Sequence, residues 1–233
     1  MSALKLSEDR NLGRFGSLLL ALLAIFAAAP FAGRTQSPVQ ILSLAFSAVL
    51  LAGVYSVSQR RRVLYVAIAI AAPTLAFEWI SNYHTTTFTL VTNLVLLGVF
   101  VAFVAAVVLV EVLEEDRVSL DTIFGGIAIY LLIGLGWAIA FSILEHLEPG
   151  SYPFAGQALQ EIRLPYEFVF PELLYFSFVT LTTLGYGDMT PATQPARALA
   201  VSEAMAGQLF VAIFIARLVA LHITHAARDR SRD

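Results

Sequence analysis

Seven consecutive residues have a composition suited to binding a bare cation. Positions 182 to 188 read Thr-Thr-Leu-Gly-Tyr-Gly-Asp. Backbone oxygens can replace the hydration shell of an ion when successive carbonyls point into one narrow path. Gly185 and Gly187 favour such a path, because glycine adopts backbone angles that a side chain forbids. The chemistry expected of this loop is the reversible dehydration of a cation.

The residues before the loop have the pattern of a short helix that ends at it. Proline suits the first position of a helix and a carboxylate favours the positive end of the helix dipole, so Pro171-Glu172 indicates a start. About 12 residues, through Thr182, give a helix of roughly 18 Å, which is about half a membrane. Its partly negative C-terminal end would favour a cation. An ordinary turn is the alternative, but such a string arises by chance on the order of once in two million start positions.

The composition places this loop in a membrane protein. Hydrophobic residues make up 58% of the 233 residues and charged residues 13%, and the mean hydropathy is +0.79. The chain has room for about six spanning helices of roughly 20 residues. The absence of cysteine excludes disulfides and thiolate metal sites. A net charge of -3 gives no indication of a nucleic-acid partner.

Polar and turn-forming residues divide the chain into long apolar segments. These segments cover residues 15–32, 39–58, 63–80, 87–113, 122–147 and 195–225. Residues 148–194 are too polar and too rich in proline to span, so they are expected to enter and leave the membrane on one side. Ser119 or Asp121 is placed to cap the fifth segment. We therefore predict an all-α integral membrane protein with six transmembrane helices and a re-entrant helix between the fifth and sixth.

The distribution of basic residues predicts the orientation. On one side lie Lys5, Arg10, Arg14, Arg60 to Arg62, Arg117, Arg228, Arg230 and Arg232. The other side has only Arg34, Arg163 and Arg197. By the positive-inside rule both termini are cytoplasmic and residues 148–194 enter from outside.

The first segment has a second interpretation as a cleaved signal peptide. Basic residues and a leucine-rich run precede Ala27-Ala28-Ala29, a possible small-residue cleavage site. Pro30 directly after that site argues against cleavage.

Residues 175 to 191 carry a resemblance to a known family. They read Tyr-Phe-Ser-Phe-Val-Thr-Leu-Thr-Thr-Leu-Gly-Tyr-Gly-Asp-Met-Thr-Pro, which resembles the pore helix, selectivity filter and following turn of the tetrameric potassium channels. The closest resemblance is to prokaryotic-type members with six transmembrane helices and one pore loop per subunit, and it is specific from about 171 to 226. It implies a homotetramer in membrane lipid that passes K⁺ passively. K⁺ is then the permeant cargo, and neither an organic cofactor nor a nucleic-acid partner is expected.

The resemblance also implies roles for individual residues. The filter would bind K⁺ through Thr183, Leu184, Gly185 and Tyr186, with Gly187 completing it. Support of the filter is expected from Asp188, Tyr175, Thr182, Val179 and Glu203. Gly207 stands at the position of a gating hinge, and the inner cavity would be lined by Gln208, Val211 and Ile215.

Three filter-region residues depart from the family pattern. Leu184 stands where valine is commonest, and Tyr175 stands where many members have tryptophan. Val179 replaces a glutamate that in some members braces the filter aspartate. These departures bear on inactivation more than on ion selectivity.

The resemblance and the segments together predict the domain organisation. The expected parts are a cytoplasmic N-terminus at 1–14, a four-helix membrane domain at 15–113, a cytoplasmic linker at 114–121, a pore domain at 122–226 and a cytoplasmic tail at 227–233. Because the tail is short, a cytosolic ligand-binding domain is not expected. The expected location is the inner (plasma) membrane of a bacterial cell.

Several polar residues have two interpretations each. Glu203 either forms a hydrogen bond to the pore helix, through Thr180 or Thr182, or acts as a proton- or K⁺-sensitive brace behind the filter. Gln208 either lines the cavity or bonds a neighbouring helix. Other polar positions have a structural interpretation: Arg217 as a snorkelling residue, Glu78 as an interfacial acid after Pro73, and His222 with His225 as interfacial residues rather than metal ligands.

The fourth segment bears on gating and on the alternatives in function. Residues 86 to 110 contain no arginine or lysine, whereas a voltage sensor carries arginines at every third position of one helix. Weak voltage dependence is expected. The competing functions are a weakly selective cation channel and a non-conducting, channel-derived scaffold or regulatory subunit. An enzyme is not expected, because the chain has no nucleophile–base pairing, nucleotide loop or convincing metal cluster.

Overall fold

The regular secondary structure of the described residues is helical, and two isolated β-bridges lie outside the helices. The computed structural model describes residues 13–32, 38–58, 60–81, 86–115, 119–157 and 169–230. These residues form seven α-helices: α1 (Arg14–Ala32), α2 (Pro38–Ser56), α3 (Arg61–Ser81), α4 (Thr87–Glu114), α5 (Leu120–Leu147), α6 (Val169–Leu181) and α7 (Gln194–Arg230). Each predicted apolar segment corresponds to one helix, and α6 lies where the short helix before the loop was predicted.

Four of the helices are long and apolar enough to cross a membrane. They are Arg61–Trp79 within α3, Thr87–Glu114, Leu120–Leu147 and Gln194–Leu221 within α7. The corresponding parts of α1 and α2, Arg14–Ala27 and Ser43–Ser56, are apolar but shorter. The chain is therefore an all-α integral membrane protein with four candidate spans, and the crossing of α1 and α2 remains a prediction.

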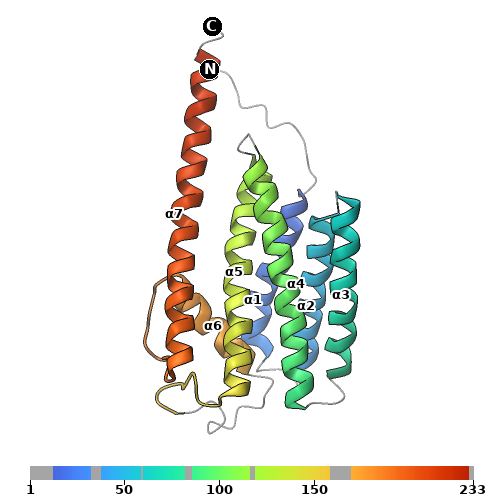
Figure 1. Cartoon of the computed structure of the whole chain (residues 1–233), viewed down its shortest axis with the longest axis vertical. Helices are drawn as coiled ribbons and strands as arrows, with labels where there is room; N and C mark the ends of the chain where they lie inside the picture. The colour runs from blue at the N-terminus through green and yellow to red at the C-terminus, as the bar shows by residue number, and fades with distance from the viewer. Residues whose placement is uncertain are drawn as a thin grey trace.

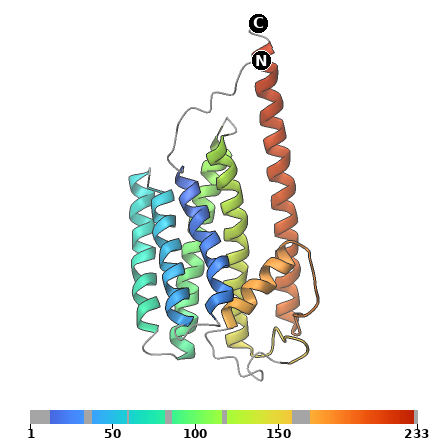
Figure 2. The same ribbon diagram turned by 180° about the vertical axis from the view of Figure 1, so that it is seen from behind.

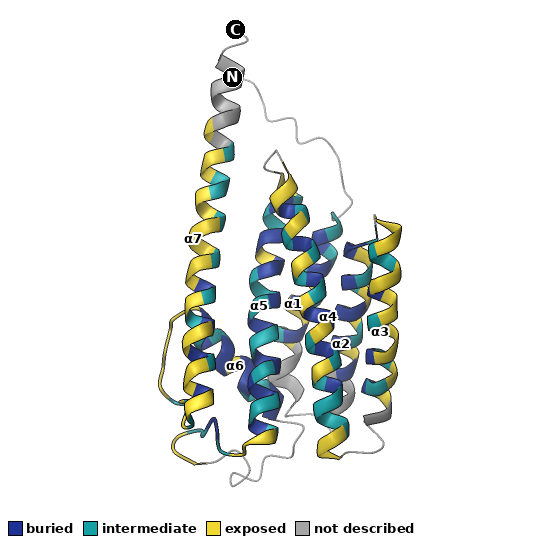
Figure 3. Ribbon diagram, viewed as in Figure 1, coloured by how far each residue is buried: buried dark blue, intermediate teal, exposed yellow. Residues whose placement is uncertain are grey.

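The helices form a bundle with one short helix wedged at its edge. The first four helices run alternately up and down beside α5, while α7 stands apart and is reached through α6 (Figures 1 and 2). The main packing partners of α5 are α4, α6 and α1. One apolar core joins α1 to α6 and includes Phe15, Leu18, Phe100, Leu132 and Leu174. Most of α7 is exposed, whereas α6 is largely buried (Figure 3).

Capping boxes fix the starts of α4 and α5. The Thr86 side chain accepts a hydrogen bond from the backbone N–H of Thr89, whose hydroxyl accepts one from the Thr86 N–H. Ser119 and Thr122 make the same exchange at the start of α5. Of the two predicted caps for α5, Ser119 is thus the one observed. Asp121 instead accepts a bond from the backbone N–H of Phe15 at 3.2 Å.

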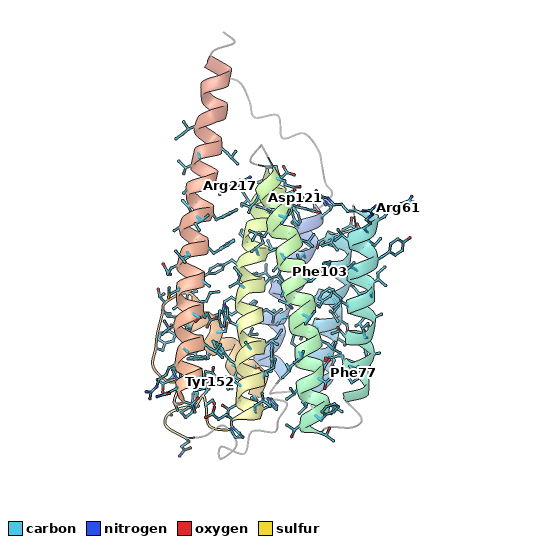
Figure 4. The ribbon with its side chains drawn as sticks, viewed as in Figure 1. Arg61, Phe77, Phe103, Asp121, Tyr152 and Arg217 are labelled. Carbon is cyan, nitrogen blue, oxygen red and sulfur yellow. The ribbon has the colours of Figure 1, made fainter. Side chains whose placement is uncertain are left out.

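The end of the bundle that holds the starts of α1, α3 and α5 is polar. Arg14 pairs with Glu111 at 3.0 Å and Arg60 with Glu114 at 2.7 Å. Arg217 of α7 donates to the backbone carbonyls of the α4 C-terminus: Val112, Leu113 and Glu115. These carbonyls have no partner within α4, and the Arg217 guanidinium satisfies them. That Arg217 snorkels to the interface stays a prediction. Figure 4 shows Arg61, Asp121 and Arg217 at this end.

Glu78 departs from its predicted environment. Its side chain is 8% exposed and accepts hydrogen bonds from Ser43 of α2 at 2.8 Å and Asn93 of α4 at 2.5 Å. An interfacial acid was the wrong interpretation, because α2 and α4 supply polar partners that a single sequence does not place beside α3. Glu78 thus links three of the first four helices.

Close contact between α6 and α7 requires a glycine at position 207. A Cβ built there would lie 2.6 Å from the backbone oxygen of Leu181. That oxygen is at the C-terminal end of α6 and cannot move without displacing the loop. By contrast, a Cβ at Gly136 of α5 would meet its nearest atom at 3.8 Å.

We expect Gly207→Ala to lower the thermal unfolding midpoint of the detergent-solubilised protein. Overpacking typically costs about 1–3 kcal/mol, more than the roughly 1 kcal/mol gained from the better helix propensity of alanine. Gly136→Ala is the matched control and should be neutral or stabilising. Equal midpoints for the two variants would contradict the close α6–α7 contact.

Candidate pore site

The short helix α6 is too short to span a membrane and is held by its neighbours. Its 13 residues give a length of about 20 Å. Phe176 packs on Phe141 of α5 and on Tyr152, with ring centroids 5.2 Å apart in both pairs. A Cβ at Gly134 of α5 would lie 2.4 Å from the Phe178 ring, so glycine there lets α6 approach closely. The packing of Phe176 and Phe178 thus holds α6 against α5 and so sets the position of the loop that follows α6.

The loop after α6 alternates in backbone handedness. Thr183, Gly185 and Gly187 have φ of 59°, 59° and 80°, while Leu184 and Tyr186 between them are not in the left-handed region. The two glycines thus adopt the backbone angles that the sequence indicated. The left-handed Thr183 was not predicted, and such a conformation costs an L-residue roughly 1–2 kcal/mol. Strain at this level is typical of functional sites.

Backbone hydrogen bonds set the direction of the loop carbonyls. The N–H of Thr183 donates to the Thr180 oxygen at 2.9 Å, and the N–H groups of Leu184 and Gly185 donate to the Val179 oxygen at 2.9 and 3.3 Å. In a trans peptide the C=O points opposite to the N–H of the same unit. The three carbonyls of residues 182–184 therefore point away from α6, on one side of the loop.

The side chains of the loop lie beside α6 instead. Leu184 and Tyr186 line a pocket of about 660 Å³ together with Tyr175, Phe178 and Val179 of α6. Leu184 is 54% exposed and Tyr186 is 67% exposed in the single chain. The loop thus has an oxygen-bearing side and a side-chain side, and the second is left open.

Asp188 closes the loop through a hydrogen bond to α6. The Tyr175 hydroxyl donates to its carboxylate at 2.6 Å, and the backbone N–H of Met189 donates at 3.0 Å. The structure therefore brings together two of the predicted support residues. The hydrogen bond from Tyr175 is the main cause that lowers the pKa of Asp188, and it raises the pKa of Tyr175 to about 12.

The segment before α6 also contacts the loop, which the sequence did not predict. The N–H of Ala155 donates to the Asp188 backbone oxygen at 2.8 Å. Glu145, at the end of α5, accepts from the N–H groups of Gly150 and Tyr152 at 2.9 Å each. Burial raises the pKa of the Tyr152 phenol, and the nearby carboxylate of Glu145 adds to this. A buried carboxylate thus anchors the segment that holds the C-terminal end of the loop.

Glu203 bonds α6 at a residue other than the two predicted. Its carboxyl oxygen Oε1 lies 2.5 Å from the Ser177 hydroxyl, and its side chain is fully buried. Thr180 and Thr182 were the wrong partners. Glu203 lies beside Ser177, which is nearer the start of α6. The Thr182 hydroxyl instead donates to the backbone oxygen of Phe178 at 2.6 Å. The predicted helix was right and the predicted residue was not.

The structure separates the remaining candidates on α7. Gly207 is buried against α6, whereas Gln208, Val211 and Ile215 are exposed in the single chain. The helix continues through Gly207 without interruption. Hinge and cavity roles therefore stay predictions. Among the described residues, no group of three histidine, aspartate or glutamate side chains could hold a metal ion. The side chains of His222 and His225 lie outside the described residues.

We expect Tyr175→Phe to raise the pKa of Asp188 toward that of an ordinary aspartate. Because the phenol stabilises the ionised form, the wild-type carboxylate stays charged to a more acidic pH than the variant does. Carbon NMR titration of labelled aspartate measures this shift. Tyr65→Phe, an exposed tyrosine on α3, is the control. An unchanged Asp188 titration in Tyr175→Phe would refute the link.

Comparisons with known proteins agree with this geometry. A family model described as "Ion channel" matches residues 120–223, which include α5, α6, the loop and most of α7. Protein LctB of Bacillus caldotenax is 31% identical over 128 residues, covering 52% of this chain and 92% of that protein. Protein LctB of Geobacillus stearothermophilus is 31% identical over 114 residues, covering 47% of this chain and 78% of that protein.

A shorter similarity extends to plant proteins. Two pore potassium channel c of Oryza sativa subsp. japonica is 46% identical over 48 residues, which are 21% of this chain and 10% of that protein. No solved structure matches. The comparisons identify an ion channel rather than an enzyme. The chain belongs to the ion channel family and carries its pore domain in the C-terminal half.

Proposed function

We propose that the chain is a potassium-selective channel that passes K⁺ down its electrochemical gradient. The observation that carries the proposal is the backbone of the loop. Its handedness alternates over residues 183–187, and the bonds from the N–H groups of residues 183–185 to α6 turn the carbonyls of residues 182–184 to one side. Carbonyls arranged in this way replace the water around a dehydrated monovalent cation. The K⁺ ligands are then Thr183, Leu184, Gly185 and Tyr186.

The proposed assembly is a homotetramer around the loop. One loop cannot surround an ion, and residues 182–187 are all exposed in the single chain. Irregular backbone at membrane depth is tolerated only where protein covers it or where it lines water. Further copies of the chain supply that cover, with the carbonyl side of each loop facing a central axis. The open pocket beside Leu184 and Tyr186, and the exposed face of α7, then become contacts between subunits.

The proposed topology has six spans, a four-helix domain of residues 15–113 and a pore domain of residues 122–226. Arginines 14, 60, 61, 62 and 217 gather at one end of the bundle, and Arg61 and Arg217 mark that end in Figure 4. By the positive-inside rule it faces the cytoplasm. The loop and the segment at 148–157 then face the opposite side.

Only a small free-energy difference is needed for selectivity. A hundredfold preference for K⁺ over Na⁺ corresponds to about 2.8 kcal/mol. The number and field of the carbonyl ligands can supply a difference of this size. The similarity to rice two pore potassium channels, over 48 and 46 residues, supports K⁺ as the cargo.

We expect Gly185→Ala to abolish K⁺ flux into liposomes that contain the purified protein. Alanine is strained at φ of 59° by roughly 1–2 kcal/mol, and relief of that strain rotates the filter carbonyls. Gly156→Ala is the matched control, because Gly156 also has a positive φ, 81°, but lies outside the filter and has nothing within 4 Å of an added Cβ. It should retain flux.

The same liposomes distinguish the alternatives. Reversal potentials in mixed K⁺ and Na⁺ that follow the K⁺ gradient support the proposal, and potentials near zero indicate a weakly selective cation channel. No flux from a folded tetramer would indicate a non-conducting scaffold and would overturn the proposal.

We expect a shallow conductance–voltage relation. Helix α4, Thr87–Glu114, contains no lysine or arginine, so it carries no cationic gating charge across the field. Voltage-clamp recording of the purified channel in a planar bilayer measures the slope. A steep curve with several gating charges would contradict this prediction.

A further inference from the structure

Ser177 joins the three helices of the pore domain through one hydroxyl group. Its oxygen lies 2.7 Å from the backbone oxygen of Gly134 on α5 and 2.5 Å from Oε1 of Glu203 on α7. Both distances are those of O–H···O hydrogen bonds. Ser177 and Glu203 are both fully buried, so solvent does not complete the arrangement.

The number of protons decides the state of Glu203. A serine hydroxyl has one hydrogen, and a backbone carbonyl can only accept. If Glu203 were ionised it could only accept too, and one of the two contacts would join bare oxygens. If Glu203 is protonated, its O–H donates to Ser177, and Ser177 donates to Gly134. Only the neutral acid provides a hydrogen for both contacts.

The surroundings of Glu203 also favour the neutral form. Among the described residues no lysine, arginine or histidine lies within 4.0 Å of its carboxyl group, and its second oxygen, Oε2, has no hydrogen-bond partner. The titratable groups that interact with Glu203 are Tyr130 of α5 and Tyr152, which lies in the segment after α5. Behind Tyr152 stands Glu145, another acid. A buried carboxylate without a cation is strongly disfavoured, whereas a neutral acid is tolerated.

The position of this link connects it to the filter. Ser177 lies two residues before Val179, whose carbonyl accepts the N–H groups of Leu184 and Gly185. The same stretch of α6 that Glu203 holds therefore orients the carbonyl side of the loop.

We propose that Glu203 is a positioning residue that acts as a protonated acid: its proton, relayed through Ser177 to Gly134, holds α6 and so keeps the filter conductive. When Glu203 loses that proton at alkaline pH, the single hydrogen of Ser177 can serve only one of its two acceptors, the Gly134 oxygen or the Glu203 carboxylate. The carboxylate is then also a buried charge. The pore helix is then released and ion flux falls. This inference rests on the proposed function, since it assigns a proton-dependent support to the same filter.

The test compares wild type with Glu203→Gln in K⁺-flux liposomes from acidic to alkaline pH. The wild-type flux should fall as pH rises, by up to about tenfold per pH unit because one proton titrates. In Glu203→Gln the amide donates to Ser177 at every pH, so flux should persist at alkaline pH. Glu115→Gln removes an exposed acid at the far end of α4 and should keep the wild-type profile. A wild-type profile in Glu203→Gln would overturn the proposal.

Infrared difference spectroscopy gives a readout that does not depend on conduction. The wild-type tetramer in lipid should show the C=O stretch of a buried protonated carboxyl group, which should disappear at alkaline pH and be absent in Glu203→Gln. No such band in wild type would overturn the proposal even if Glu203→Gln failed to assemble. A band without any K⁺ flux would sustain the protonated acid and instead count against the proposed function.

Discussion

Backbone at membrane depth must satisfy its own N–H groups, and the pore site is organised around that requirement. The last carbonyls of α6 have no partner within the helix, and the N–H groups of residues 183–185 bond them. One set of hydrogen bonds thus ends α6 and leaves the carbonyls of residues 182–184 free on the opposite side. In the proposed channel, an ion would take the place that water otherwise fills.

Holding α6 steady is consequently the main task of the elements around it. A helix of half-membrane length buries little area, so its neighbours approach more closely than ordinary side chains allow. Gly134 admits the Phe178 ring and Gly207 admits the backbone of Leu181. The close approach also brings the Ser177 hydroxyl within reach of two other helices. The two glycines and the Ser177 hydroxyl therefore both hold α6 against α5 and α7.

The sequence predicted the elements better than the contacts between them. Apolar run length depends on local composition, and so the helices fell within a few residues of their predicted bounds, except for the later end of α7. Gly185 and Gly187 predicted the left-handed backbone at their own positions. The left-handed conformation of Thr183 could not be predicted from its residue type, because it follows from the hydrogen bonds to α6. Ser177 as the partner of Glu203, and the α4 carbonyls as the partners of Arg217, depend on the relative rotation of helices. One sequence does not encode that rotation in any short pattern.

The two halves of the molecule meet mainly through α5. Helices α1 and α4 pack on α5, whereas the main partners of α7 are α6 and α5. Other contacts do not involve α5: Phe26 of α1 and Phe46 of α2 pack on Phe178 and Phe170 of α6. Arg217 reaches from α7 to the last carbonyls of α4. An arginine there satisfies three acceptors at once and stays charged at any physiological pH. The contact therefore ties the C-terminal half of α7 to the first four helices by hydrogen bonds that no titration can break. The N-terminal part of α7 is held to α6 by the contact between Glu203 and Ser177, which on our proposal depends on one proton. The two ends of α7 are thus held by interactions of different kinds, and a change in pH acts on only one of them.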